Sequence, residues 1–424
     1  MDIYKKRLAD ELLKEKLAGK GAVLIEGPKW CGKTTTAEQI ASSILYMADP
    51  KAKKQNIMLA DANPETLLKG ETPRLIDEWQ LAPKLWDAVR FEVDKRHDFA
   101  QFILTGSSVP ADMSDVSHTG TGRFSWLKMR PMSLFESGES TGEVSLKALF
   151  ENRKSVYAKN SLTLEDVAFL VCRGGWPVST YLSGKLALNQ AVDYFDSVVN
   201  SDISRVDGIK RDPEKAKRIL RSFARNQGSQ IGEDTILTDI VSSDDDSISR
   251  GTVRSYIEAL KKIFVIEDMP AWNPNLRSKT AIRTSDTRYF VDPSIAAAAL
   301  GFGPGDLMND LKTFGLMFET MAIRDLRVYS QTLGGDVYHY RDKSGLECDA
   351  VIHLRNGRYG LVEIKLGGDK LIAEGCDSLL KLSKLIDTEK MNKPSFLMVV
   401  TANGNMAYED ENGVFVVPVG TLGA

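Results

Sequence analysis

The sequence predicts an α/β protein of several domains, and three observations support this class. Its 424 residues exceed what one ordinary hydrophobic core accommodates. Short apolar runs alternate with helical patterns from 21 to 131, which is typical of a parallel sheet with crossover helices. Further on, helical patterns and strand-like runs occur in separate blocks. We therefore expect a parallel-sheet domain at 1–140, a helical segment at 145–210, a winged-helix-like segment at 211–295 and an α/β domain at 305–424.

Composition and charge narrow the class of protein. The chain is 42% hydrophobic and 27% charged, which is ordinary for a globular protein. Its net charge of -3 excludes a chain-wide basic field, so any contact with nucleic acid requires a local patch. The sequence lacks a run of about 18 apolar residues and the apolar stretch of a signal peptide. These features predict a cytoplasmic protein that is not embedded in a membrane.

Four apolar runs predict the strands of the N-terminal sheet, with helices between them. The runs are Ala22–Ile25, Ile57–Leu59, Arg74–Ile76 and Phe102–Leu104. A helix is predicted over 35–45, between the first and second runs.

A phosphate-binding pattern follows the first run. The residues Gly27, Pro28, Lys29, Trp30, Cys31, Gly32, Lys33 and Thr34 match GxxxxGK[ST] at every specified position. Backbone N–H groups of such a loop turn around phosphates, Lys33 reaches the β and γ phosphates, and the Thr34 hydroxyl ligates magnesium. Thr35 opens the following helix and completes the expected binding set. The sequence therefore predicts ATP and Mg²⁺ as ligands.

Two acids stand at the end of the third run. Ligands of parallel sheets gather at the carboxyl ends of the strands. Asp77 is predicted to hold magnesium through water, and Glu78 to polarise the attacking water. A solvated strand end would explain such a pair standing alone, but the loop upstream favours the catalytic interpretation.

Polar residues after the fourth run are further candidates. Thr105 and Ser107 are suited to sensing the γ-phosphate or orienting the water, although small polar residues after a strand are usually turn formers. Arg123 follows a Gly/Thr-rich loop at 118–121. It either neutralises transition-state charge, in its own site or a neighbour's, or is a surface arginine.

The ordered series of motifs resembles the archaeal and bacterial AAA-type ATPases that carry a C-terminal domain of unknown function. The series comprises Gly27–Thr34, Leu75–Glu78, Leu104–Ser108, Gly122–Arg123 and Pro131–Glu136, and Arg173–Pro177 also matches. The resemblance covers nearly the whole chain, and Met132 stands where family members have Leu. It implies an AAA-like sheet in which the strand bearing Thr105 lies between the strands bearing the loop and Asp77.

The segment 211–295 has the element order of a winged helix. Within it, 249–262 is predicted to be an amphipathic helix that buries Val253, Tyr256, Ile257 and Leu260 and exposes Arg250, Arg254 and Lys261. Such basic groups suit a DNA recognition helix. Further basic candidates are Lys215, Lys217, Arg218, Arg221, Arg225, Arg277, Lys279 and Arg283. Acids at 233–234 and 244–246 would repel phosphate, and winged helices also dock proteins, so both interpretations stay open.

The last segment contains a cluster of carboxylates and a lysine. Glu363 and Lys365 are two apart in a predicted strand and so project from one face, and Asp349 begins the preceding strand. Two carboxylates and a lysine together suit a magnesium site. With Glu319 on the preceding helix, the set resembles the PD-(D/E)xK nuclease superfamily, and Cys348 replaces the proline of that name. Such folds also persist as inactive scaffolds.

The sequence thus predicts an ATP-hydrolysing protein and leaves two hypotheses for its purpose. In the first, the ATP state controls a DNA-binding or DNA-cutting C-terminal region. In the second, the chain is an ATP-dependent switch that recruits proteins, and the nuclease-like fold is an inactive scaffold. A homo-oligomer or a protein partner is compatible with both.

Overall fold

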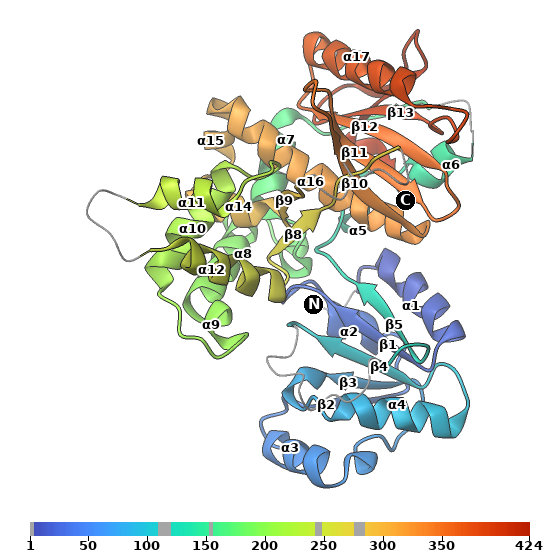
Figure 1. Ribbon diagram of the computed structural model, residues 1–424, viewed down its shortest axis with the longest axis vertical. Coiled ribbons are helices and arrows are strands. Elements are labelled where there is room, and N and C mark those ends of the chain that lie inside the picture. The colour runs from blue at the N-terminus through green and yellow to red at the C-terminus, as the bar shows by residue number, and fades with distance from the viewer. Residues whose placement is uncertain (1–3, 109–119, 152–155, 242–247, 275–284) are drawn as a thin grey trace. The chain divides into compact units, whose positions relative to one another are not determined.

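The computed structural model describes residues 4–108, 120–151, 156–241, 248–274 and 285–424 (Figure 1). The predicted wing residues Arg277, Lys279 and Arg283, the acids at 244–246 and part of the loop at 118–121 lie outside these ranges. The chain divides into two compact units that interleave along the sequence. The first comprises Met1–Pro131, Ser197–Asp212 and Tyr256–Val265, and the second comprises Met132–Asp196, Pro213–Ser255 and Ile266–Ala424.

A five-stranded parallel sheet forms the centre of the first unit. Its strands are β1 (Ala22–Glu26), β2 (Ser43–Tyr46), β3 (Arg74–Asp77), β4 (Phe102–Gly106) and β5 (Phe124–Lys128). They lie in the order β2-β3-β4-β1-β5, and each neighbouring pair is parallel. Strand β4, which bears Thr105, therefore lies between the strand that precedes the loop and the strand that bears Asp77. This confirms the order implied by the resemblance.

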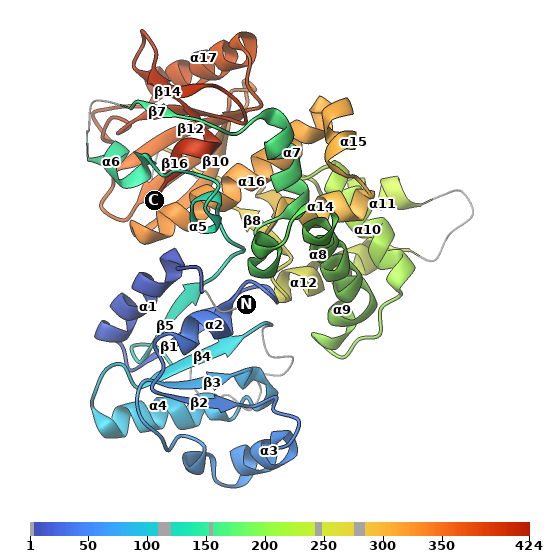
Figure 2. The ribbon, with the colours of Figure 1, turned by 180° about the vertical axis from the view of Figure 1, so that it is seen from behind.

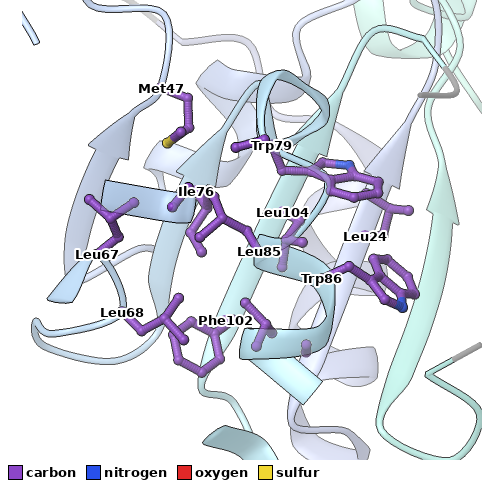
Figure 3. Packing of buried hydrophobic residues seen from close by; sticks show 14 of the residues in the cluster. Leu24, Met47, Leu67, Leu68, Ile76, Trp79, Leu85, Trp86, Phe102 and Leu104 are labelled. Atoms are coloured by element: carbon purple, nitrogen blue, oxygen red, sulfur yellow. The ribbon is translucent and has the colours of Figure 1, made fainter. Parts of the chain in front are cut away.

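Helices cover both faces of this sheet. They include α1 (Leu8–Gly19), α2 (Lys33–Glu38), α3 (Lys53–Ala62) and α4 (Leu85–Arg96). Residues of α3 and α4 pack on one face, around Leu24, Ile76 and Leu104 (Figure 3). On this face Trp86 stacks on Phe124 with ring centroids 3.9 Å apart. Residues of α1 and α2 pack on the other face, around Val23 and Ile25. Burial on both faces explains why these strands are continuous apolar runs rather than alternating ones.

Two element predictions in this unit are wrong. The helix expected over 35–45 ends at Glu38, and 43–46 forms the edge strand β2. The run Ile57–Leu59, expected to be a strand, lies inside α3. A three-residue apolar run does not distinguish strand from helix, and its Lys, Gln and Ala neighbours favour a helix. Strand β2 exists because it pairs with β3, a contact between segments about 30 residues apart.

The second unit contains a seven-stranded mixed sheet of order β10-β11-β12-β13-β15-β14-β7. These strands are β7 (Ala158–Lys159), β10 (Gly335–Arg341), β11 (Glu347–Leu354), β12 (Tyr359–Lys365), β13 (Leu397–Thr401), β14 (Met406–Glu409) and β15 (Val414–Pro418). Helix α17 (Asp369–Leu385) packs Leu379 and Leu382 against Leu361 and Val399 of the sheet (Figures 1 and 2). The predicted strand that bears Asp349 and the one that bears Glu363 and Lys365 are confirmed as β11 and β12.

The segment predicted to be helical at 145–210 also contributes strands. Besides β7, it supplies part of β6 (Val144–Ser145), which pairs with β16 (Leu422–Gly423) at the C-terminal end (Figure 2). Both strands have two residues, too few to show a periodicity of two in sequence. Its helices are α6 (Leu146–Phe150), α7 (Leu164–Arg173), α8 (Gly184–Ser197) and α9 (Ile203–Arg205).

The segment 211–295 has three helices followed by a two-stranded antiparallel sheet. They are α10 (Pro213–Arg225), α11 (Glu233–Ile240), α12 (Arg250–Lys262), β8 (Ile266–Met269) and β9 (Thr287–Phe290). The four apolar residues predicted to be buried on α12 are each no more than 5% exposed, which confirms its amphipathic pattern. Its assignment as a winged helix stays a prediction. Helices α14 (Pro293–Leu300), α15 (Pro304–Asn309) and α16 (Leu311–Thr332) follow.

The motif Pro131–Glu136 begins a short helix of the second unit, α5 (Leu134–Ser137). The Glu136 carboxylate accepts hydrogen bonds from the backbone and the hydroxyl of Ser133, which closes a capping box. The Met132 N–H donates to the carbonyl of Gly175 at 2.6 Å. The two motifs at 131–136 and 173–177 are therefore in direct contact.

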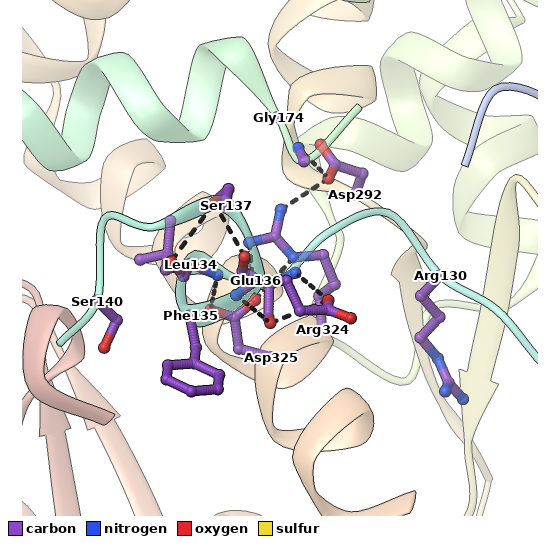
Figure 4. Close-up of polar contacts among 12 residues, drawn as sticks. Arg130, Leu134, Phe135, Glu136, Ser137, Ser140, Gly174, Asp292, Arg324 and Asp325 are labelled. Carbon is purple, nitrogen blue, oxygen red and sulfur yellow. Dashed lines mark hydrogen bonds and ion pairs between the residues drawn. The ribbon is translucent and has the colours of Figure 1, made fainter. Parts of the chain in front are cut away.

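A buried network of charged side chains holds the motifs at 131–136 and 173–177 in contact (Figure 4). Arg324 pairs with Asp292 at 2.8 Å and with Asp325 at 2.7 Å, and all three side chains are at most 1% exposed. The Leu134 N–H donates to Asp325, and the Gly175 N–H donates to Asp292. Charged side chains at this depth require partners, so both motifs have an architectural role in the second unit.

Candidate active site

The predicted phosphate-binding loop connects β1 to α2 and depends on its glycines. Gly27 has φ +154°, and a Cβ atom there would lie 2.1 Å from the Met129 carbonyl oxygen. Gly32 has φ +99° and immediately precedes α2. These conformations and this close approach exclude larger side chains, so both glycines of the pattern are required by the loop's shape.

Lys33 lies inside the loop. Its ammonium group donates to the Gly27 carbonyl at 2.9 Å and to the Pro28 carbonyl at 2.7 Å, and the side chain is buried. The side chain of Lys33 thus crosses the loop from its C-terminal end to the carbonyls at its N-terminal end.

Two of the predicted residues, Thr34 and Thr105, converge on the carboxylate of a third, Asp77. Asp77 at the end of β3 accepts a hydrogen bond through Oδ1 from the Thr34 hydroxyl at 2.6 Å. The same oxygen accepts one from the Thr105 hydroxyl at 2.7 Å. Asp77 and Thr105 are buried, and the three side chains come from α2, β3 and β4. The sheet order, rather than proximity in sequence, brings them together.

Glu78 adopts a left-handed backbone conformation with φ +57° directly after β3. Its carboxylate accepts a hydrogen bond from the Ser107 hydroxyl at 3.3 Å and a close one from the Gln80 amide. Ser107 was a sequence candidate, but Gln80 was not. These two contacts fix the direction of a half-buried carboxylate next to Asp77.

Arg123 does not join this group. Arg123 lies just before β5, at the end of the sheet where the strands begin, because Phe124 pairs with Ala22. The loop follows Glu26, at the opposite end, where the strands finish. Five strand residues span roughly 16 Å. Arg123 is exposed and pairs with Asp94 of α4 at 2.7 Å. The surface alternative fits this position, and a role in the chain's own site does not.

Sequence reasoning missed two contacts to the loop. Lys29 pairs with the buried carboxylate of Asp202 at 2.6 Å. Arg7 donates to the Cys31 carbonyl at 2.7 Å. Asp202 lies 173 residues from its partner and Arg7 lies 24 residues from its partner, and neither residue belongs to a motif. No periodicity or spacing in the sequence marks such pairs.

In the second unit, three residues of the predicted C-terminal cluster do meet. Lys365 donates to Asp349 at 3.1 Å and to Glu363 at 2.5 Å. The Ile364 N–H also donates to Asp349, at 2.7 Å, and the Ser378 hydroxyl donates to Glu363. The prediction that Glu363 and Lys365 share a face of β12 is confirmed. The two carboxylates share one ammonium ion as their common partner.

Glu319 lies nearby, beneath residues from the middle of the chain. The Tyr289 hydroxyl of β9 donates to Glu319 at 2.5 Å. A Cβ atom on Gly228 would lie 3.0 Å from the Glu319 carboxylate. Asp349, Glu319 and Tyr289 line a cavity of about 40 Å³, which has room for water. The segment containing Gly228 and β9 therefore covers Glu319.

Burial and, after it, the charge of Asp349 raise the pKa of Glu319 and of Glu363 to about 8 each. Burial lowers the pKa of Lys365, but the charges of Asp349 and Glu363 raise it by more. Within the described ranges, no three His, Cys, Asp or Glu side chains are grouped to hold a metal ion. Asp349 and Glu363 share the ammonium group of Lys365, and the magnesium site predicted for this cluster stays a prediction.

The outward arginines of α12 have acidic partners. Arg250 lies 3.3 Å from Asp234 and 3.5 Å from Glu233, and Arg254 lies 3.7 Å from Glu233. The acids at 233–234 therefore neutralise these arginines within the second unit. This face is less basic than the helix pattern alone predicts.

Comparison with known families defines the class of the first unit. Residues 19–137 match a family model described as an AAA domain. This range contains the loop at 27–34 together with Asp77, Glu78 and Thr105. This part of the chain therefore has the fold of an AAA-type P-loop ATPase domain. Two other models, both domains of unknown function, match 164–306 (DUF8612) and 314–422 (DUF4143). The second agrees with the C-terminal domain of unknown function that the resemblance implies.

Two mycobacterial proteins are similar along most of the chain. The uncharacterized proteins Rv2008c of Mycobacterium tuberculosis and Mb2031c of Mycobacterium bovis are each 22% identical over 381 residues. The match covers 89% of this chain and 78% of each relative.

Solved structures are similar only at low scores. The Walker-type ATPase Paby2304 of Pyrococcus abyssi has a TM-score of 0.44 and 14% identity, covering 70% of this chain and 96% of its own. A RuvB variant of Thermotoga maritima has a TM-score of 0.27 and 18% identity, covering 62% and 87%. In the ranges that the structure describes, no helix is both long enough and apolar enough to cross a bilayer.

Proposed function

We propose that the first unit binds ATP with Mg²⁺ and hydrolyses the bond to the γ-phosphate. The observation that carries this proposal is the convergence of Thr34 and Thr105 on one oxygen of Asp77, at 2.6 and 2.7 Å. This group lies beside a loop that encloses the ammonium group of Lys33. A lysine inside a glycine loop, with a hydroxyl and a carboxylate beside it, suits a triphosphate and a hard cation.

Lys33 supplies the first part of the binding chemistry. Its present partners are the neutral carbonyls of Gly27 and Pro28. A phosphate oxygen carries negative charge and therefore attracts the ammonium ion more strongly than a neutral carbonyl does. Phosphate oxygens therefore compete successfully for this ammonium group.

Thr34 and Asp77 offer the ligands for the metal. The hydroxyl would bind Mg²⁺ directly and the carboxylate through water, and the ion would supply charge neutralisation on the phosphates. Thr105, buried and bonded to Asp77, holds that carboxylate in position.

Glu78 is the proposed acceptor for the proton of the attacking water. Its contacts with Ser107 and Gln80 orient it next to Asp77. A carboxylate held in this way positions the water for in-line attack and accepts its hydrogen bond.

Two variants test this proposal. Lys33→Ala is expected to abolish ATP binding in titration calorimetry. Glu78→Gln is expected to keep ATP binding and to lose phosphate release, because the amide no longer accepts a proton. The exposed Glu65→Gln is the control and is expected to match the natural chain. Unchanged affinity in Lys33→Ala refutes the binding site, and unchanged phosphate release in Glu78→Gln refutes the assignment of Glu78.

The nucleotide state of this unit is further proposed to control the C-terminal region. Control of DNA binding or cutting is supported by the chemistry of Asp349, Glu363 and Lys365, which lie together as the sequence predicts. Control of protein recruitment, with the nuclease-like fold as a scaffold, is supported by the acid partners of Arg250 and by the covering of Glu319.

One set of measurements separates these two proposals. DNA-dependent acceleration of ATP turnover, with magnesium-dependent cleavage that Glu363→Ala abolishes, supports the first. Fluorescence anisotropy of a labelled duplex at low salt, where phosphate contacts are strongest, gives the other outcome. A protein with neither affinity nor cleavage there contradicts the DNA-acting form and favours the recruiting switch.

A further inference from the structure

We infer that Arg7 is a positioning residue for the phosphate-binding loop. It holds the peptide between Cys31 and Gly32 so that the Gly32 N–H faces the phosphates, and it ties the loop to the segment that leaves β5. This inference rests on the proposed ATP binding and adds a residue and a route of regulation to that site.

The guanidinium group of Arg7 bridges two backbone carbonyls. One terminal nitrogen donates to the Cys31 carbonyl at 2.7 Å, and the other donates to the Arg130 carbonyl at 2.9 Å. The side chain is only 6% exposed. Because the guanidinium is a rigid planar fork, it sets these two carbonyls at a fixed distance from each other. Lysine carries the same charge but not this geometry.

The contact with Cys31 determines the direction of the next amide. A trans peptide is planar, so its C=O and N–H point in opposite directions. With the Cys31 carbonyl directed to Arg7, the Gly32 N–H points away from Arg7. Gly32 has φ +99°, a conformation that glycine adopts readily. Its N–H belongs to the set that this loop pattern directs at phosphate oxygens.

The N-terminal segment that carries Arg7 is itself held against the loop. The Arg7 backbone N–H donates to Asp10 at 2.9 Å, where it caps α1. The Tyr4 hydroxyl donates to the same carboxylate at 2.6 Å and lies 2.8 Å from the Thr36 hydroxyl of α2. This segment thus contacts the chain on both sides of Lys33, at Cys31 and at Thr36. These buried contacts fix the position from which Arg7 acts.

Arg7 also connects the loop to the exit of β5. The Met129 N–H donates to the Glu26 carbonyl at 2.7 Å, directly before the loop. The Met129 carbonyl oxygen lies 3.9 Å from the Cys31 sulfur and lies against Gly27. Loop and exit segment are therefore packed backbone to backbone. A shift of the Cys31 peptide on phosphate binding moves Arg7 and, through it, the carbonyl of Arg130.

The test compares Arg7→Gln and Arg7→Lys with Lys14→Gln, an exposed position on α1 whose ammonium group pairs with Glu11 at 2.8 Å. Titration calorimetry with ATP and Mg²⁺ is expected to show about ten- to hundred-fold weaker binding for Arg7→Gln. Arg7→Lys is expected to restore part of this loss, and Lys14→Gln is expected to bind as the natural chain does.

A second readout separates positioning from simple stabilisation. In the natural chain, ATP is expected to change amide hydrogen exchange in the peptide 124–131, and Arg7→Gln is expected to lose this response. If Arg7 only stabilised the fold, its variants would unfold at lower temperature while binding ATP normally. If Arg7→Gln does not fold, the same calorimetry and hydrogen-exchange measurements are made on Arg7→Lys.

The Lys33→Ala variant separates a failure of the inference about Arg7 from a failure of the proposed ATP binding. If this variant loses ATP while both Arg7 variants bind it normally, the role of Arg7 is overturned and the proposed function stands. If the natural chain itself does not bind ATP, the proposed function is overturned, and the inference about Arg7 is overturned with it.

Discussion

Replacing Arg324 by methionine tests how the second unit is held together. Methionine keeps much of the side-chain volume but removes the charge that Asp292 and Asp325 share. All three side chains are at most 1% exposed, so solvent does not compensate the two carboxylates left behind. Removing one member of a buried ion pair costs about 3–5 kcal/mol. We therefore expect Arg324→Met to lower the free energy of unfolding of the second unit by about 4 kcal/mol at pH 8.

The loss is expected to depend on pH in a definite direction. Burial raises the pKa of Asp325 to about 6, although Arg324 lowers it. A carboxyl group with a raised folded-state pKa stabilises the fold when protonated, and this contribution declines as pH rises from about 4 to 6. Without Arg324 the pKa rises further, and the decline continues to higher pH. The loss in Arg324→Met is therefore larger at pH 8 than at pH 5.

Urea unfolding, followed by hydrogen exchange in peptides from 287 to 330, measures this loss. Lys390→Met is the control, because Lys390 and its partner Asp387 are 78% and 48% exposed, and such surface pairs contribute little to stability. A loss below about 1 kcal/mol for Arg324→Met at pH 8 refutes the reasoning. Equal losses at pH 5 and pH 8 refute the part that concerns ionisation.

Three further predictions concern charges near the two candidate sites. Lys29→Met is expected to weaken ATP binding roughly three-fold, because the Asp202 carboxylate then faces the loop without its partner. Calorimetry of the double variant with Asp202→Asn is expected to show the affinity restored, and an affinity that stays low contradicts this role of Asp202. Lys365→Met is expected to destabilise the second unit by about 3 kcal/mol at pH 9 and by less at pH 6. Lys365 lowers the pKa of Glu363, so without the lysine this pKa rises further above about 8 and an ionised Glu363 costs the fold more. Equal losses of stability at the two pH values in urea unfolding would exclude this effect. Tyr289→Phe is expected to raise the pKa of Glu319 further above about 8, because the hydroxyl that is lost donates a hydrogen bond to the ionised carboxylate. An unchanged carboxyl titration in the infrared spectrum argues against this contact.

The order of motifs was predictable because each motif is local. The loop at 27–34, the acids Asp77 and Glu78 and the strand before Thr105 are each a few consecutive residues whose spacing reflects one turn or one strand end. The amphipathic pattern of α12 and the shared face of Glu363 and Lys365 follow in the same way from periodicity within one element. Local chemistry and geometry suffice for such features.

Other features depended on contacts between distant segments. Residues 43–46 form a strand because β3 pairs with them, and Arg123 lies away from the loop because β5 runs parallel to β1. The contacts of Arg7 with Cys31 and of Lys29 with Asp202 have no periodicity that the sequence displays.

By itself, the sequence determined the chemical groups of this protein: the glycine loop with its lysine, the acids at a strand end, and the carboxylates around Lys365. Only the tertiary structure decided which of these groups meet, which are neutralised and which are covered. The physical reason is that a side chain's partners across the fold depend on strand order and helix packing. Those are set by burial of apolar surface over the whole chain and not by the residues beside it.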